Sequence, residues 1–444
     1  KLSLYGKVTI INSLIIPQFT HLFQVLPMPD KQLFIDFERK VFSFIWSGGP
    51  ERVSRKTMYN SIENGGLNLK NLYALALTIK ASWVPKLYSN PSWFSAWLLR
   101  VHPNVVEDLF PFFQIKSVQH LKIGSFLSEA LLAWYKFQYK TPTTAREIRQ
   151  QLLFMNTNIC IEGVPFVFNA FVNRKIVFIN DIVNSNGNIL TYDEFSTKYG
   201  TICNHFKYTQ LISAIPSKWK SILCNNFPDQ VCIPLIQNYT WLKQTKINKC
   251  MYKFFLLSNN LMDTAHNVQL SWLYLFDSPI PWKVVYTLLT YCTIDPTLRF
   301  FQYKILHKFL PTNRLLHIWK LTDDPLCSFC HLEEETYLHV FWECPNLIAF
   351  WNKLKIWYLQ KTGQEILLNG FNIIFGNLFP GTPVIQNFII LLAKYFIYHS
   401  RKSKKVNFES FIVYLFFFNK VELYMATRKN KLEKHLGKWG RLCV

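Results

Sequence analysis

Two cysteines three positions apart, followed by a histidine and a third cysteine, constrain this chain more than any other feature of its sequence. The residues are Cys327, Cys330, His339 and Cys344, a spacing of C-x2-C-x8-H-x4-C. A C-x2-C turn presents two thiolates to one ion, and a tetrahedral zinc site closes with two further sulfur or nitrogen ligands. Four protein ligands leave no open position. The pattern therefore predicts a structural zinc site that folds a short, loop-rich segment.

The same residues allow a second interpretation, in which the four side chains are unrelated. The chain has 10 cysteines, so a C-x2-C pair can arise by chance, and these thiols would then be free and buried. His331 is a rival ligand, but it adjoins Cys330 and would strain the loop, and the alternative for it is a solvated loop histidine. The acidic run Glu333–Glu335 is expected to be solvated and to favour a helix N-terminus. The scattered remaining cysteines favour a reducing compartment.

The charge of the chain indicates a polyanionic partner. Lysine and arginine number 49 against 27 acidic residues, which gives a net charge of +22. Such an excess favours RNA and/or DNA first and an anionic membrane surface second. The candidate phosphate contacts in the C-terminal part are Lys304, Lys308, Arg314, Arg401, Lys402, Lys404 and Lys405. The alternative for these cations is a solvated face.

Aromatic residues alternate with the basic residues after position 298. They are Phe300, Phe301, Tyr303 and Trp319. Aromatic side chains can stack on unpaired bases, but helical spacing favours burial in the core for most of them. The basic run Arg401–Lys405 also fits a nuclear-localisation patch, so we expect the nucleus and/or the cytoplasm as location.

Composition and periodicity predict a mainly α protein. Hydrophobic residues make up 50% of the 444 residues and glycine and proline number only 15 and 21, which excludes a disordered or collagen-like chain. No apolar run reaches the ~18 residues of a transmembrane helix, so no transmembrane segment is expected. Apolar spacing near 3.6 predicts a helix over Lys31–Trp46, capped by Asp30 and ended by Gly48. A helical pattern from Leu4 to Leu26 should break near Pro17.

Four parts are expected along the chain. They are a helical segment at 1–88, a helical middle connector at 89–270 with possible short strands at 166–180, a small zinc-knuckle helical module at 271–352 and a basic helical tail at 353–444. Further helices are predicted at 121–139, 144–153, 240–260, 282–293 and 299–310.

Catalytic signatures are missing from the sequence. There is no Tyr/Phe-x-Asp-Asp, Walker, Gly-x-Ser-x-Gly or His-Glu-x-x-His pattern, and Asp323-Asp324 lies in a loop closed by Pro325. We therefore expect no catalytic residue, no small-molecule substrate and no enzymatic activity of the chain itself.

Residues beyond the zinc pattern extend it into a family signature. They are Phe301–Leu316, Glu335-Thr336, Phe341-Trp342 and Trp351, with Leu2–Val8, Phe44–Trp46, Gly65–Leu67, Ile374–Gly376 and Lys394–Tyr398 outside that region. With the four ligands, the stretch 272–351 resembles the reverse-transcriptase zinc-binding domain near the C-terminus of LINE-type, non-LTR retrotransposon polymerases. Lys7 stands where members of this family often have arginine, which conserves the charge.

The resemblance implies a chain that begins inside or just after the thumb of such a polymerase. The helical segment 1–88 would be thumb-like, and Lys31–Trp46 would follow the backbone of a duplex. The resemblance implies phosphate contacts at Lys40, Arg52, Arg55 and Lys56. The resemblance implies a structural zinc and a grip on template RNA or target DNA in target-primed reverse transcription. The RNA-directed DNA polymerase activity of the family would need catalytic aspartates upstream. The alternative is a co-opted helical interaction or membrane-surface adaptor without a nucleic-acid role.

Overall fold

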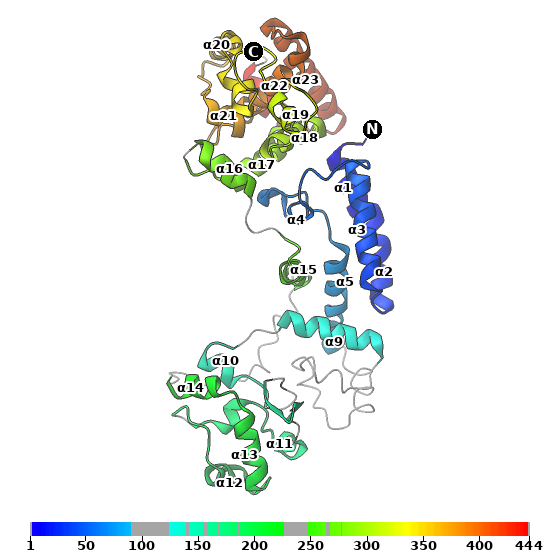
Figure 1. Ribbon diagram of the computed structural model, residues 1–444, viewed down its shortest axis with the longest axis vertical. Coiled ribbons are helices and arrows are strands. Elements are labelled where there is room, and N and C mark those ends of the chain that lie inside the picture. Colours follow the sequence, from blue (N-terminus) through cyan, green and yellow to red (C-terminus); the bar gives the residue numbers. More distant parts are fainter. Residues whose placement is uncertain are drawn as a thin grey trace. The chain divides into compact units, whose positions relative to one another are not determined.

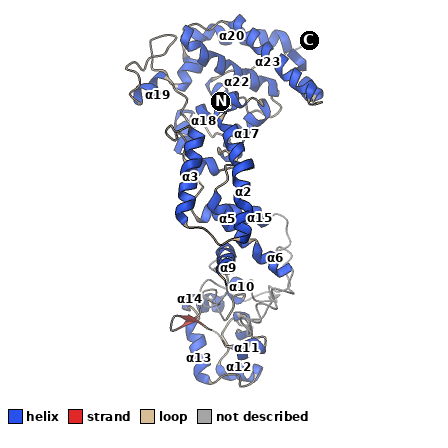
Figure 2. Cartoon of the chain, turned by 90° about the vertical axis from the view of Figure 1, so that its right-hand side faces the viewer, coloured by secondary structure: helices blue, strands red, loops and turns tan. Residues whose placement is uncertain are grey.

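Helices dominate the structure of this protein. The computed structural model describes residues 2–89, 124–138, 142–153, 156, 158–166, 168–184, 186–225, 247–262, 267–276 and 278–442. Within these residues the one sheet is a hairpin of β1 (Cys160–Ile161) and β2 (Val164–Pro165), red in Figure 2. The mainly α prediction is confirmed.

The protein forms two compact units. The first consists of Lys1–Ser13, Arg39–Lys70 and Leu261–Val444, and the second of Leu14–Glu38 and Asn71–Asn260. Each unit is therefore assembled from segments that are far apart in the sequence. Both the beginning of the sequence and the cysteine pair belong to the first unit.

Instead of the expected break near Pro17, the first helical stretch changes its winding just before this residue. Helix α1 (Leu4–Ile10) continues through a π-helical turn, Ile11–Ile15, into α2 (Ile16–Val25). Proline cannot donate the regular backbone bond, and a wider turn before it relieves the clash. By length and composition alone, Leu4–Val25 is long and apolar enough to cross a membrane, with a mean hydropathy of 1.2. It is the one such helix among the described residues and is weak evidence for a membrane segment, since core helices of soluble proteins and signal sequences also pass this test.

Helix α3 (Lys31–Trp46) has the bounds that its apolar period predicts. Gly48 ends it with a φ of +76° and donates its N–H to the carbonyl of Ser43 at 2.9 Å. Lys7 donates to the carbonyls of Phe44 and Ile45 at 2.8 and 2.9 Å. These last-turn carbonyls have no partner within the helix, so the ammonium of Lys7 caps its C-terminal end. The ammonium of Lys7 is therefore bound by backbone carbonyls of this protein.

The second unit consists mainly of short helices, and it contains a buried lysine. The helices are α5 (Leu72–Ala81), α6 (Trp83–Ser89), α9 (Ser125–Gln138), α10 (Ala145–Arg149), α11 (Asn169–Asn173), α12 (Tyr192–Tyr199), α13 (His205–Ala214), α14 (Ser217–Asn225) and α15 (Ile247–Ser258). The ammonium of Lys80 is fully buried on α5 and lies 3.2 Å from the Glu129 carboxylate of α9. The flanks of the predicted helices at 121–139 and 240–260 lie outside the described residues.

Among the described residues of 166–180 no strand is formed, and Phe178 makes only an isolated bridge with Leu152. Helix α11 and a 3-10 helix, Ile179–Ile182, occupy this range, and the hairpin lies just before it. Asp181 accepts the N–H groups of Val177 and Phe178, both at 2.8 Å. A local side-chain acceptor of this kind takes the backbone donors that a strand ladder would need.

The C-terminal part of the first unit has one continuous apolar core. Its helices are α16 (Asn267–Phe276), α17 (Trp282–Cys292), α18 (Pro296–Leu306), α19 (Asn313–Ile318), α20 (Pro345–Thr362), α21 (Gly370–Phe375), α22 (Val384–Ser400), α23 (Phe408–Arg428) and α24 (Leu432–Trp439). Helix α22 packs against α17, α18, α21, α23 and α24 (Figure 1), and its residues Ile385–Lys394 are all buried. A helix that is buried on all sides marks the centre of the core. Cys327 and Cys344 belong to the same core.

Candidate metal centre

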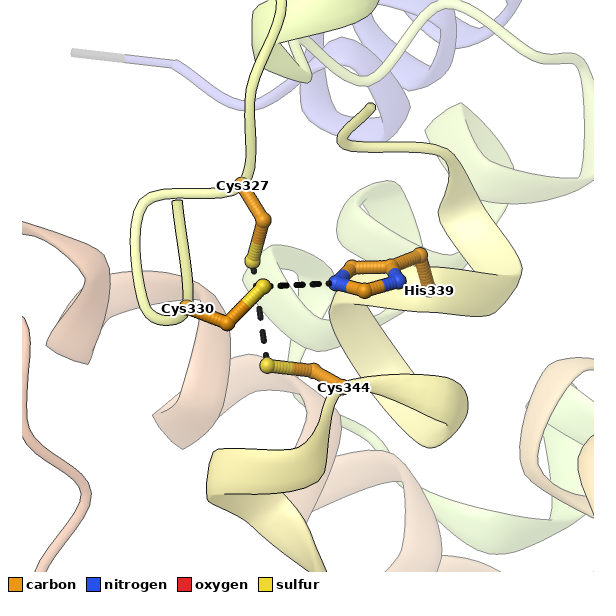
Figure 3. Close-up of side chains that lie close together, drawn as sticks. All are labelled: Cys327, Cys330, His339 and Cys344. Atoms are coloured by element: carbon orange, nitrogen blue, oxygen red, sulfur yellow. Dashed lines mark hydrogen bonds between the residues drawn. The ribbon is translucent and has the colours of Figure 1, made fainter. Parts of the chain in front are cut away.

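Four side chains converge at one point in the segment that connects α19 to α20. The ligand atoms of Cys327, Cys330, His339 and Cys344 all lie within 4.8 Å of one another (Figure 3). The Sγ atoms of Cys327 and Cys344 are 3.8 Å apart, and Cys330 Sγ lies 3.3 Å from His339 Nε2. Zinc bonds of the usual lengths put two sulfurs about 3.8 Å apart and a sulfur and a nitrogen about 3.5 Å apart in a tetrahedron. These residues therefore fit a structural Cys3His zinc site.

The first cysteine pair is held by a tight backbone loop. Cys327 donates its N–H to the Glu333 carbonyl at 2.8 Å, and the N–H of His331 returns to the Cys327 carbonyl at 3.0 Å. The N–H of Phe329 points at Cys327 Sγ at 3.4 Å. Such donors stabilise a thiolate and so favour metal binding. His331 is exposed in the left-handed conformation, with a φ of +56°, and lies outside the cluster.

A π-helical turn brings the second pair to the same side. It spans His339–Glu343, and the N–H of Cys344 donates to the His339 carbonyl at 3.0 Å. Five residues of regular α-helix would point two side chains about 140° apart. The wider π turn reduces this angle, so His339 and Cys344 face the same point. Pro345 then begins α20 immediately after the last ligand.

Glu333 orients the histidine ligand by contacting the ring nitrogen that points away from the cysteines. Its Oε2 lies 3.0 Å from His339 Nδ1, and the other ring nitrogen, Nε2, faces the cysteines. A carboxylate at this position fixes the tautomer and raises the basicity of a zinc-bound imidazole. Sequence reasoning treated Glu333 as part of a solvated run, although an acid between the cysteine pair and the histidine was a signal for this role.

We expect Glu333→Ala to weaken zinc binding by about 10- to 100-fold, because the imidazole loses the group that orients it. Competition with a chromophoric chelator measures this affinity. The matched control is Glu334→Ala, since Glu334 pairs with Arg314 at 3.4 Å on the surface and not with a ligand. Equal zinc affinities for the two variants would contradict the assignment of Glu333.

Burial keeps two of the three thiols protonated in the absence of metal. It raises the pKa of Cys327, and it raises the pKa of Cys344 to about 12. Burial also tends to raise the pKa of Cys330. The N–H groups of Leu332 and Glu333 and the neighbouring His339 outweigh it and lower this pKa to about 7. Zinc must displace the protons of the buried thiols, so its affinity falls as the pH falls.

A buried carboxylate fixes the loop to the surrounding helices. Glu335 is fully buried and accepts the N–H groups of Asn313 at 2.9 Å and of Ser328 at 3.0 Å. The Ser328 hydroxyl donates to it at 2.8 Å, and Arg401 Nη2 lies 2.7 Å from its Oε1. The expectation that the acidic run is solvated is wrong for this residue. Each oxygen of the carboxylate has a partner, which is the condition for burying a charge.

Several of the residues predicted to contact phosphates bind to other groups of this protein instead. The guanidinium of Arg401 also donates to the carbonyl of Pro311 at 2.9 Å. Lys308 donates to the carbonyl of Ser271 at 3.1 Å, and burial lowers its pKa to about 8. Burial also lowers the pKa of Lys304, whose ammonium lies 4.7 Å from the centre of the Phe300 ring.

The other predicted contacts differ in their exposure. Arg52 lies 4.3 Å from the Trp319 ring, and Arg55 forms a two-pronged ion pair with Glu51. The remaining ones are exposed, and they are Lys40, Lys56, Arg314, Lys402, Lys404 and Lys405. Of the aromatic residues, Phe301 and Tyr303 are buried in the core, as helical spacing predicted.

Comparison with known proteins matches one segment of the sequence. Residues 272–351 match the family described as zinc-binding in reverse transcriptase. All four clustered residues, and Glu333 and Glu335, lie inside this range. The match explains the geometry, because a zinc-binding domain needs the four ligand atoms that the structure brings together. Residues 272–351 are therefore similar to a reverse-transcriptase zinc-binding domain, and they form a structural zinc site.

Proposed function

We propose that this protein is the nucleic-acid-binding C-terminal part of a LINE-type, non-LTR retrotransposon reverse transcriptase. In this role it grips template RNA or target DNA during target-primed reverse transcription. The observation that carries the proposal is the Cys3His cluster inside the segment that matches the reverse-transcriptase zinc-binding family. The net charge of +22 supports a polyanionic partner. Binding through phosphates is largely independent of sequence, because phosphate contacts carry little base information.

The exposed cations are the proposed contacts. Lys402, Lys404 and Lys405 follow α22 in an exposed segment, and Lys40 and Lys56 are exposed near the other end of the sequence. Within the described ranges the structure records no ion pair for any of these five. Free lysines can release counterions from a nucleic-acid backbone, whereas the guanidinium of Arg401 is engaged by Glu335.

The proposed role includes no chemistry of its own. No polymerase aspartate pair occurs in the sequence, so the RNA-directed DNA polymerase activity belongs to the upstream part of the parent family. We place the protein in the nucleus and/or the cytoplasm, where both its RNA and its DNA partners occur.

Replacing Lys402 and Lys405 by alanine should reduce the dependence of binding on salt. Each phosphate contact to a single strand contributes about 0.7 to the slope of log K against log salt, so the double variant should lower it by about 1.4. Fluorescence anisotropy with a labelled RNA oligonucleotide at several salt concentrations measures the slope. Lys355→Ala with Lys361→Ala, two exposed lysines of α20, is the control of equal charge. A parent protein without salt-dependent binding would refute the proposed function.

A membrane-surface adaptor is the second candidate, favoured by the apolar stretch Leu4–Val25. Leu14, Leu22 and Val25 of this stretch are 60, 45 and 56% exposed. Such residues can enter a lipid interface next to basic residues. Binding to phosphatidylserine vesicles in preference to RNA at equal ionic strength would favour this function over the first.

A further inference from the structure

A basic groove lies on the first unit, away from the zinc cluster. It has a volume of about 600 Å³ and is formed by the end of α17, the start of α22, the end of α23 and α24. We call it the α24 groove, and the residues that matter here are Tyr291, Val384, Met425, Lys429, Lys431 and Lys434. None of them is among the phosphate contacts that the sequence suggested.

Three lysines of the α24 groove have free charges. Lys429, Lys431 and Lys434 are exposed, and among the described residues the structure gives them no ion-pair partner. The one acid among the described residues that line the groove is Glu422. Its two carboxylate oxygens both accept from Lys438 at 2.8 Å, and one accepts the indole N–H of Trp439 at 2.7 Å. The three lysines therefore give the groove an uncompensated positive charge, which suits an anionic ligand.

The lining also contains apolar side chains and one exposed aromatic ring. Val384 is 40% exposed, Met425 is half-buried, and Tyr291 at the end of α17 is 71% exposed. Among the described residues no aromatic ring packs against Tyr291, so its exposed ring is available to a ligand. Bases stack on such rings when they are unpaired, and lysines beside the ring hold the phosphates. A duplex has its bases stacked inside and cannot use the ring.

We propose that the α24 groove binds single-stranded nucleic acid, with Lys429, Lys431 and Lys434 on the phosphates and Tyr291 stacked on a base. The inference rests on the proposed function and names the place and the form of its partner. It adds a binding site to the exposed lysines after α22. The ring gives this site a preference for unpaired strands that lysines alone would not supply.

The test compares variants of the 444-residue protein by fluorescence anisotropy with a labelled oligothymidylate of about 20 nucleotides, long enough to cover one binding site. Lys429→Ala, Lys431→Ala and Lys434→Ala together should lower the salt slope by about 2. The control triple of equal charge is Lys355→Ala, Lys361→Ala and Lys420→Ala, exposed lysines outside the groove. Tyr291→Leu should weaken oligothymidylate binding at least about fivefold and leave the slope unchanged, whereas Tyr291→Phe should retain the affinity. Circular dichroism confirms that each variant is folded.

The outcomes separate this inference from the proposed function. Suppose that the parent protein binds the oligothymidylate. If the groove triple variant then keeps the full salt slope, or if the control triple variant loses as much of it, the α24 groove is not the binding site. The proposed function would still stand. A parent protein that binds no oligonucleotide at any salt concentration overturns both. Equal affinity for a blunt duplex, with no effect of Tyr291→Leu, overturns the single-stranded ligand. Loss of binding by the groove triple to phosphatidylserine vesicles but not to the oligothymidylate overturns the inference and assigns the groove to a membrane instead.

Discussion

Cys327→Ser is expected to abolish stoichiometric zinc binding and to unfold the loop from Leu326 to Cys344. The thiol of Cys327 is fully buried, and its Sγ lies 3.8 Å from that of Cys344. Serine supplies a poor zinc ligand, and its hydroxyl would be buried without a partner. Structural zinc binding contributes on the order of 10 kcal/mol of apparent free energy at pH 7, so the loop cannot stay folded without it. Elemental analysis should fall from about one zinc per molecule to nearly none.

The control for this prediction is Cys203→Ser, a buried cysteine of the second unit that lies outside the cluster. It should keep the zinc content of the parent protein. Chelation of the parent protein should reproduce the effect of Cys327→Ser, with loss of protection from proteolysis in the segment 326–344. A Cys327→Ser protein that retains one zinc per molecule would refute the assignment of this ligand.

Arg401→Ala is expected to destabilise the first unit by about 3–5 kcal/mol, the usual cost of leaving one partner of a buried ion pair alone. Glu335 would then keep its backbone donors at Asn313 and Ser328 but lose the only cation beside it among the described residues. Urea unfolding, followed by tryptophan fluorescence, measures the free energy of unfolding.

Two further variants make the Arg401 prediction specific. Arg314→Ala removes an exposed ion pair with Glu334 and should cost less than about 1 kcal/mol. Glu335→Gln combined with Arg401→Leu leaves no uncompensated charge and should recover part of the stability. If Arg401→Ala and Arg314→Ala cost the same, the buried pair contributes no more than a surface pair.

The sequence predicts the elements whose causes are local. Helix α3 begins and ends as predicted, because its apolar period and its glycine stop lie within the segment itself. The π-helical turn before Pro17 also has a local origin, although the helix continues through it where a break was expected. The expected strands at 166–180 failed because Asp181 takes two backbone donors, an effect that periodicity does not reveal.

The metal site shows the same difference between features with local causes and features that depend on distant residues. The four ligands are readable from their spacing, because a C-x2-C turn and a later histidine and cysteine are close in the sequence. The partners of Glu335 are not readable, since Arg401 lies far along the sequence and meets it only after the core has formed. The π-helical turn that aligns His339 with Cys344 also follows from packing rather than from a local motif.

The division of the first unit into distant segments has a consequence for folding during synthesis. Tyr5 meets Tyr303, and Trp46 meets Phe309, with ring centres 6.3 and 6.1 Å apart. Lys70 leaves the ribosome long before Leu261, where the last segment of this unit begins. At cellular rates of translation this interval is roughly 10–40 s. Tyr5 and Trp46 lack these two ring partners for that time, so we expect chaperones to bind the apolar surface around them until the zinc-binding part emerges.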